Sequence, residues 1–260
     1  MRFRLGAIDG VLKASWEEVF KLASKAGLEG VELGVGEDYF KTKLWNVEGR
    51  RELKELSEAS GIPIVSICLH TYWRFSFASN EEKTRIRARQ VAEQAAEFAS
   101  ELGAKNLLIP LTSAEGVNPE EAKVRWIRGM MSCASVTEKL GVTYALENVG
   151  QPFARSGAQL ASIVDEIGSP AVRAYYDPGN AVYANLDPVV DIGILGRRIS
   201  QVHMKDPGGV HLGEGRMDIP SVLGALEDAG FTGWLILETQ PTNDPLAACR
   251  RNLEFLRKLL

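Results

Sequence analysis

Eight short runs of strand-forming residues alternate with longer helical patterns along the whole chain. Strands that alternate with helices pair in parallel, because each helix returns the chain to the edge where the strand began. Eight such units in 260 residues match a closed barrel better than the competing doubly wound open sheet. Since no Pro- or Ser-rich linker divides the chain, the predicted fold is a single-domain (β/α)8 TIM barrel of the α/β class, covering residues 1–260.

The repeated units have well-marked bounds. The third helix shows the pattern best: apolar residues from Val91 to Leu102 recur at spacings of 4, 3 and 4, which is one helical face, and Gly103 suits the left-handed position that ends a helix. Asn80 is predicted to cap the start of this helix. The predicted strands cover residues 3–8, 30–33, 64–69, 106–109, 142–147, 172–177, 199–204 and 234–238. The predicted helices cover residues 15–26, 48–60, 81–102, 119–140, 157–167, 188–195, 219–229 and 245–260.

Charge and cysteine usage exclude several classes of protein. A net charge of −4 and a pI of about 5.6 do not resemble a basic nucleic-acid-binding surface. The three cysteines are widely spaced, which favours a reducing compartment over a disulfide framework. No stretch approaches the roughly 18 apolar residues of a membrane span. We therefore expect a soluble, cytoplasmic protein with neither nucleic-acid nor membrane partners; a homo-oligomer is compatible with this sequence.

Four consecutive predicted strands end in a side chain that is able to bind a metal ion. These residues are Glu147, Asp177, His203 and Glu238, separated by 30, 26 and 35 residues. Each gap is about one βα unit, so the four side chains should lie at the same height on neighbouring strands. Active sites of such barrels lie at this carboxyl edge.

The four residues together favour a divalent metal. Any one of them alone would be read as a loop residue, a helix cap or half of an ion pair. Three carboxylates that converge in a barrel mouth repel one another, and a divalent cation removes that repulsion. Three oxygen donors and one imidazole suit Mn²⁺ best, with Co²⁺, Mg²⁺ or Zn²⁺ as alternatives.

Side chains two residues apart on a strand share a face, which brings neighbours into the predicted site. If His203 points inward, so do Gln201 and Lys205. Lys205 would either reach a substrate oxygen or form a structural salt bridge under the rim. Asp206 would either orient His203 or act as an ordinary turn residue.

Residues on the remaining loops are open to two interpretations each. His70 lies at the end of the third predicted strand. In one interpretation it contacts a substrate hydroxyl or carries a proton, and in the other it is a structural histidine. Trp73, on the loop that follows, either walls a sugar pocket or packs under the loop. Arg216 closes a glycine-rich loop, where it either binds a substrate hydroxyl or phosphate or braces the loop; His211, in the same loop, is interpreted as a loop residue.

The motifs around these residues resemble a known superfamily. ALENVG, YYDPGN, VHMKD and LILET occur in the order and spacing of the xylose isomerase-like TIM barrel superfamily, in its sugar or sugar-phosphate isomerase and epimerase branch. SICLHTYWRFSFAS and LGEGRMDIP look like the corresponding segments of L-xylulose-5-phosphate and L-ribulose-5-phosphate 3-epimerases, and the chain also resembles the ketose 3-epimerases. The resemblance covers nearly the whole chain.

The resemblance implies a site and a reaction. It implies that Glu147, Asp177, His203 and Glu238 bind one divalent metal, usually Mn²⁺, and that the two glutamates are the acid/base pair in a 3-epimerisation through a metal-stabilised enediolate. His70, Trp73, Asn180, Lys205 and Arg216 are the substrate-binding candidates. Free-ketose 3-epimerases have a histidine at the position of Asn180, whereas the phosphopentulose epimerases share the Asp-x-Gly-Asn form. This departure favours a phosphorylated ketose.

Three alternatives remain at this point. A metal-dependent dehydratase of the inosose or dehydroshikimate type uses the same scaffold and metal. An apurinic endonuclease-like phosphodiesterase needs many more imidazole ligands than the three histidines of this chain provide. A non-catalytic sugar-binding or regulatory protein would not need two glutamates beside a metal.

Overall fold

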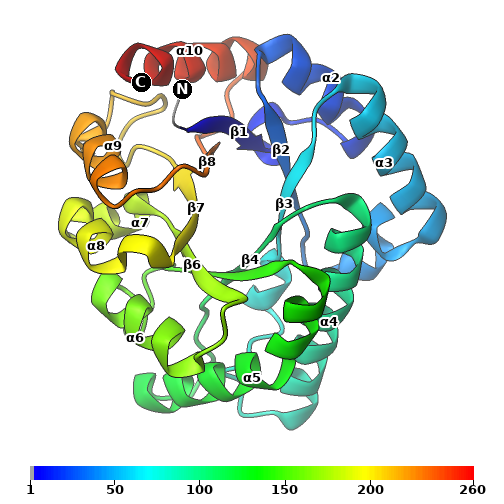
Figure 1. Ribbon diagram of the computed structural model, residues 1–260, viewed down its shortest axis with the longest axis vertical. Coiled ribbons are helices and arrows are strands. Elements are labelled where there is room, and N and C mark those ends of the chain that lie inside the picture. The colour runs from blue at the N-terminus through cyan, green and yellow to red at the C-terminus, as the bar shows by residue number, and fades with distance from the viewer. Residues whose placement is uncertain (1–2) are drawn as a thin grey trace.

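Eight parallel strands close into a barrel in the order in which they occur along the chain. The computed structural model describes residues 3–260, in which every strand pairs with its sequence neighbours and β1 pairs with β8. Figure 1 shows the helices arranged around the outside of these strands. The predicted (β/α)8 barrel is confirmed, whereas the domain bounds 1–260 stay a prediction because residues 1–2 lie outside the described part.

The predicted elements are found within a few residues of their expected bounds. The strands are β1 Arg4–Ile8, β2 Gly30–Gly34, β3 Ile64–Cys68, β4 Asn106–Pro110, β5 Thr143–Glu147, β6 Val172–Tyr176, β7 Ile199–Met204 and β8 Trp234–Leu237. The α-helices are α1 Asp9–Leu12, α2 Trp16–Ala26, α3 Val47–Ser60, α4 Glu82–Leu102, α5 Pro119–Leu140, α6 Gly157–Ile167, α7 Pro178–Tyr183, α8 Pro188–Leu195, α9 Ile219–Asp228 and α10 Pro245–Leu259. Four short 3-10 helices complete the described chain: η1 Tyr39–Lys41, η2 Lys43–Trp45, η3 His70–Trp73 and η4 Gly196–Arg198.

The strands close into a barrel because both of their faces are apolar enough to be buried. All five residues of β3 and all five of β4 are buried, as expected for parallel strands covered by helices outside and by other side chains inside. The barrel interior nevertheless contains polar side chains, all of them buried, at Glu32, Ser66, Asn106 and Gln201. Buried polar groups need hydrogen-bond partners, so these residues direct attention to the interior.

The start of α4 differs from its prediction. Glu81 occupies the N-cap position, while Asn80 instead binds the carbonyl oxygen of Glu115 and receives a hydrogen bond from Arg125. Asn80 is thus bound to the neighbouring β4–α5 segment, which competes with capping. The end of α4 is as predicted, since Gly103 has a φ of +78° and its amide donates to the last turn.

Helix α7, which follows β6 directly, was not predicted. Asp177 is its N-cap and accepts a hydrogen bond from the Asn180 amide at 3.0 Å, and Pro178 occupies the first helical turn. This is the arrangement that Asp-Pro favours at a helix start. The capping hydrogen bond occupies Oδ1 of Asp177, so Oδ2 takes no part in capping.

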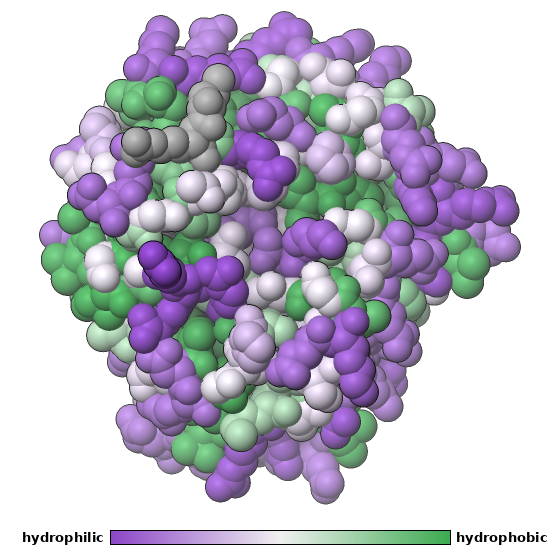
Figure 2. Space-filling view, viewed as in Figure 1, coloured by the Kyte–Doolittle hydropathy of each residue, from purple (hydrophilic) through white to green (hydrophobic). Residues whose placement is uncertain are grey.

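The surface in view in Figure 2 is mainly hydrophilic around its rim, with an apolar area where Figure 1 labels α8. Val189, Val190 and Ile194 on this helix are exposed. Within residues 3–260, no helix combines the length and the apolar character that crossing a bilayer requires.

Candidate metal centre

Four acidic and imidazole side chains meet at the carboxyl edge of the barrel. Glu147 ends β5, Asp177 follows β6, His203 lies near the end of β7, and Glu238 follows β8. One ligand atom from each lies within 4.8 Å of the others. These are the four residues that the spacing of strand ends predicted to meet. Asp177 and His203 are fully buried, Glu147 is buried, and Glu238 is partly open.

The contacts of the cluster centre on His203 and Lys205. Nδ1 of His203 lies 3.1 Å from Glu147 Oε1 and 3.3 Å from Glu238 Oε2. Lys205 Nζ lies 2.6 Å from Asp177 Oδ2 and 2.8 Å from Glu238 Oε2. Lys205 does form a salt bridge, but the bridge lies within the cluster and not under the rim, and this position leaves a contact to a substrate oxygen open.

The residues present fit a divalent cation. Asp177 Oδ2 is buried and receives no well-aligned hydrogen bond, although it forms an ion pair with Lys205. A buried carboxylate oxygen without such a bond is costly unless a cation is near. Three carboxylates and one imidazole are the donor set of Mn²⁺ and similar ions. The geometry of the cluster and its donor atoms therefore both fit a divalent cation.

The pKa values of the two glutamates shift in opposite directions. Burial raises the pKa of Glu147 to about 7, against the opposing influence of His203. Burial acts in the same direction on Glu238, but the charges of His203 and Lys205 outweigh it and lower its pKa to about 2. Burial disfavours the charged form of His203, and the surrounding carboxylates, Glu238 and Glu32 foremost, overcome this and raise its pKa. Two carboxyls with separated pKa values suit an acid and a base.

Asn148 fixes the position of Asp177 by two hydrogen bonds across neighbouring strands. Its Oδ1 accepts from the Asp177 amide at 2.8 Å, and its Nδ2 donates to the Asp177 carbonyl oxygen at 2.9 Å. Asn148 was not singled out from the sequence, although it lies in the ALENVG motif directly after Glu147. The backbone after β6 is held firmly against β5 as a result.

Glu32 on β2 contacts the other nitrogen of His203 and was also missed from the sequence. Its Oε1 lies 2.8 Å from His203 Nε2, deep inside the barrel. A signal existed, since Glu32 is a lone charged residue in the otherwise apolar run GVELG. Of the two roles considered for Asp206, orienting His203 or acting as an ordinary turn residue, the structure supports the second. Asp206 instead accepts hydrogen bonds from the amides of Gly213, Gly215 and Met217.

Replacing Asp206 by alanine should therefore destabilise the protein without removing the site. Three backbone amides would lose a charged acceptor, and hydrogen bonds of this kind each contribute about 1.5–3 kcal/mol. We expect Asp206→Ala to lower the free energy of unfolding by at least about 2 kcal/mol in urea titrations, with metal content unchanged. Loss of metal at unchanged stability would restore a role for Asp206 beside His203.

His70 and Trp73 lie on η3, directly after β3. His70 is largely buried, and its Nε2 is 3.5 Å from Cys68 Sγ. Burial lowers the pKa of its imidazole. Trp73 is 54% exposed and so is free to contact a ligand. Its neighbour Tyr72 is a core residue that donates to the Ala88 carbonyl oxygen.

The side chains of Asn180 and Arg216 point to residues outside the cluster, although the backbone amide of Asn180 donates to Asp177. The Asn180 side chain donates to the Asn148 carbonyl oxygen at 2.8 Å, so it helps to join β5 to α7. Arg216 is exposed and lines a cavity with Leu186 and Asp187 of the α7–α8 loop. None of the four cluster residues lines that cavity. The structure therefore does not bring Arg216 into contact with the cluster.

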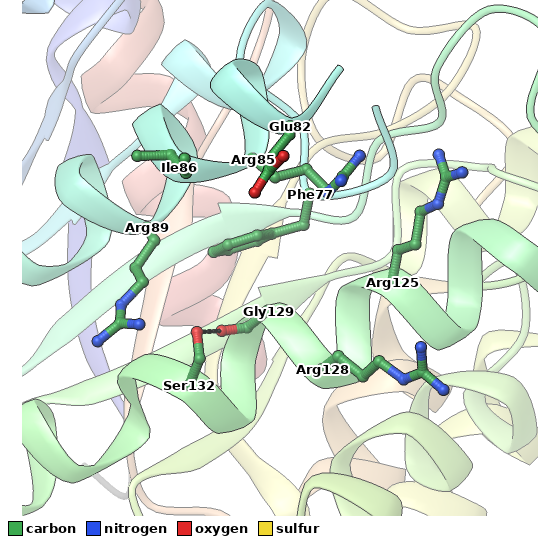
Figure 3. A pocket seen from close by; sticks show the side chains of 9 residues that line it. All are labelled: Phe77, Glu82, Arg85, Ile86, Arg89, Arg125, Arg128, Gly129 and Ser132. Atoms are coloured by element: carbon green, nitrogen blue, oxygen red, sulfur yellow. Dashed lines mark hydrogen bonds between the residues drawn. The ribbon is translucent and has the colours of Figure 1, made fainter. Parts of the chain in front are cut away.

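A second cavity, between α4 and α5, lies outside this site. Figure 3 shows the ring of Phe77 in its centre and arginines around it. Three of these arginines already have partners: Arg85 and Arg125 donate to backbone carbonyl oxygens and Arg89 pairs with Glu93. Since the lining includes none of the four cluster residues, the barrel mouth is the better candidate for chemistry.

Comparison with known proteins gives one family and several relatives. The family model described as xylose isomerase-like TIM barrel matches residues 20–259. The chain is 26% identical to a putative L-ribulose-5-phosphate 3-epimerase of Haemophilus influenzae, over 89% of this chain and 87% of that protein. It is also 26% identical to a 2-epi-5-epi-valiolone 7-phosphate 2-epimerase of an Actinoplanes species, over 99% of this chain and 95% of that protein. These relatives confirm the prediction of an enzyme of the isomerase and epimerase kind.

Solved structures show the same fold. A D-allulose 3-epimerase from a Methylomonas species, in complex with D-allulose, superposes with a TM-score of 0.87 over 100% of this chain and 98% of that one, at 17% identity. An L-ribulose 3-epimerase gives a TM-score of 0.83 over 99% of this chain and 94% of that one, at 18% identity. At these identities the likeness establishes the barrel fold.

Proposed function

Since the chain belongs to the xylose isomerase-like TIM barrel family, as its motifs predicted, we propose that it is a metal-dependent 3-epimerase of a ketose or ketose phosphate. The observation that carries this proposal is the buried cluster of Glu147, Asp177, His203 and Glu238, with ligand atoms within 4.8 Å of one another. The ion expected there is one Mn²⁺ per chain, with Co²⁺, Mg²⁺ or Zn²⁺ able to substitute.

The two glutamates are proposed to move the proton. When bound, the ion supplies Lewis-acid polarisation of the oxygen atoms that flank the reacting carbon. One glutamate removes the hydrogen at C3 as a proton, which leaves an enediolate. The other gives a proton to the opposite face of C3, and so inverts the centre. General acid–base catalysis of this kind contributes about 10²–10⁴-fold.

Lys205 is proposed to hold the carboxylates in place. Burial alone would lower its pKa, but the charges of Asp177 and Glu238 outweigh burial and raise it, so the side chain is a cation. From this position its charge favours the ionised forms of Asp177 and Glu238, although burial still leaves the pKa of Asp177 raised, and it is able to donate to a substrate oxygen. His70 and Trp73, on the loop after β3, are the proposed contacts to the rest of the sugar.

A phosphorylated ketose is the proposed substrate. Two of the relatives are named for sugar-phosphate or cyclitol-phosphate substrates, and the Asp-x-Gly-Asn form at Asp177–Asn180 supports the same choice. The cytoplasmic location expected from the cysteines is consistent with phosphorylated metabolites.

The direct test is a substrate screen with the Mn²⁺-loaded protein. Ketoses, ketose phosphates and keto-inositols are incubated in D₂O, and NMR follows exchange at C3 and the appearance of the epimer. The expected result is exchange and inversion at C3, fastest with a ketose 5-phosphate. Loss of water from a keto-inositol, with no epimerisation of any ketose, would replace this proposal by a dehydratase.

Replacing Arg216 tests whether its side chain binds a phosphate group of the substrate. If its guanidinium binds the ester, Arg216→Ala should raise KM for the ketose phosphate by at least about tenfold, or roughly 1.4 kcal/mol, and leave KM for the free ketose nearly unchanged. Arg251→Ala is the matched control, because Arg251 belongs to the neighbouring α10 and pairs with Glu214 of the same loop. An equal effect of Arg216→Ala on both substrates would count against a phosphate role.

A further inference from the structure

Glu32 is a fully buried carboxylate inside the barrel that the proposed reaction does not use. Its Oε1 lies 2.8 Å from His203 Nε2. Its Oε2 accepts from Ser66 Oγ at 2.6 Å and from the Tyr175 hydroxyl at 3.0 Å. A buried carboxylate is tolerated when several donors satisfy it, and here three different strands, β3, β6 and β7, provide them.

Starting from Asn106, each hydrogen bond in this network sets the direction of the next one. Asn106 Nδ2 donates to Gln201 Oε1 at 2.8 Å, so the Gln201 amide nitrogen faces the other way. That nitrogen donates to Ser66 Oγ at 2.6 Å and to the Tyr175 hydroxyl at 3.2 Å. Both hydroxyls therefore give their own hydrogen to Glu32. A carboxylate in this position only accepts, and with Glu32 as a carboxylate the remaining partner, His203 Nε2, donates as well.

This network determines which nitrogen of His203 is free. If Nε2 holds its hydrogen for Glu32, the lone pair of a neutral imidazole is on Nδ1. Nδ1 is the atom that faces Glu147 and Glu238. We propose that Glu32 is a positioning residue that fixes His203 as an Nδ1 ligand of the metal. The inference rests on the proposed function and names a residue outside its ligand set.

The backbone supports this assignment. The pairing of β2 with β3 shifts register between Val31 and Glu32, and that of β6 with β7 shifts between Ala174 and Tyr175. Irregularities of this kind redirect the side chains beside them. Here they lie next to two members of the network. The Tyr175 ring also contacts the His203 ring in an edge-on arrangement, with centroids 4.6 Å apart and planes inclined at 60°, so the imidazole is held by this ring as well as at Nε2.

The tautomer is measurable in the wild-type protein. With ¹⁵N-labelled histidine and Zn²⁺, which is diamagnetic, the three histidines of the chain give few signals to assign. We expect His203 to show a metal-bound Nδ1 and a protonated, slowly exchanging Nε2. A metal-bound Nε2, or a hydrogen on Nδ1, would overturn the proposal without any variant.

Variants of Glu32 test how strongly its contact with His203 affects metal affinity, and this measurement needs no substrate. Hydrogen-bond partners of metal-binding histidines typically change metal affinity by 10–100-fold. We expect Glu32→Gln and Glu32→Asp to raise the Kd for Mn²⁺, measured by electron paramagnetic resonance of the free ion, at least tenfold. Tyr175→Phe is the matched control: it removes one hydroxyl of the network but keeps the ring and the Glu32–His203 contact, so its Kd should stay within about threefold.

The outcomes separate the positioning role of Glu32 from the proposed epimerase function. Unchanged affinity in a folded Glu32→Gln or Glu32→Asp protein would remove the positioning role and leave the proposed epimerase intact. An equally large effect of Tyr175→Phe would show that the network acts only as general packing. If the wild-type protein binds neither Mn²⁺ nor Zn²⁺, the proposed function itself fails. If both Glu32 variants fail to fold, the tautomer in the wild-type protein decides.

Discussion

Glutamine in place of Glu147 or Glu238 is expected to abolish epimerisation while leaving measurable metal bound. The amide oxygen remains a donor, although a weaker one, but it neither removes nor delivers a proton. The expected loss of turnover is at least about 10²-fold if each glutamate is an acid or base. The measurement is the rate of inversion at C3 by the Mn²⁺-loaded variants, with metal content determined on the same samples.

Solvent exchange distinguishes a proton-transfer role from a ligand role. In D₂O, one variant is expected to incorporate deuterium into a single epimer, because the surviving glutamate removes and returns a proton on its own face. Glu37→Gln is a suitable control, since Glu37 is an exposed glutamate on the loop after β2 that pairs with Arg74. Near-normal turnover in either metal-loaded variant would falsify the two-base mechanism and leave a metal-binding barrel with another chemistry.

Alanine at Asp177 or His203 is expected to remove the metal itself. The wild-type protein should hold close to one divalent ion per chain. Each substitution deletes one of four donors and leaves the remaining charges of a buried cluster unbalanced, so retention after gel filtration should fall to near zero. Elemental analysis measures the metal, and circular dichroism shows whether the barrel remains folded.

Asp187→Ala is the matched control for Asp177→Ala. Asp187 has the same local role, as the N-cap of a helix with proline in its first turn, but it lies outside the cluster. Loss of a cap costs about 1 kcal/mol and should not change metal content. Full metal content in both Asp177→Ala and His203→Ala would refute the assignment of the site.

The sequence by itself determined the barrel and the four residues that meet at its carboxyl edge. Both follow from the repeat: parallel strands of similar length carry their carboxyl ends to the same edge of the barrel, so a polar residue at the end of each of four consecutive strands reaches the same rim. Glu147, Asp177, His203 and Glu238 were recognisable for this reason. The short helix α7 was missed even though its Asp-Pro start is a local signal.

Only the tertiary structure decided which side chains touch across the barrel. Alternation along a strand predicts that Gln201 and His203 point inward, but not which residue of another strand they face. His203 meets Glu32, which is 171 positions away in the chain, and Asp206 turns to its own loop instead. Closure of the barrel and two local register shifts determine which residues face each other across the barrel. Neither feature is visible in the alternation of apolar and polar residues along a strand.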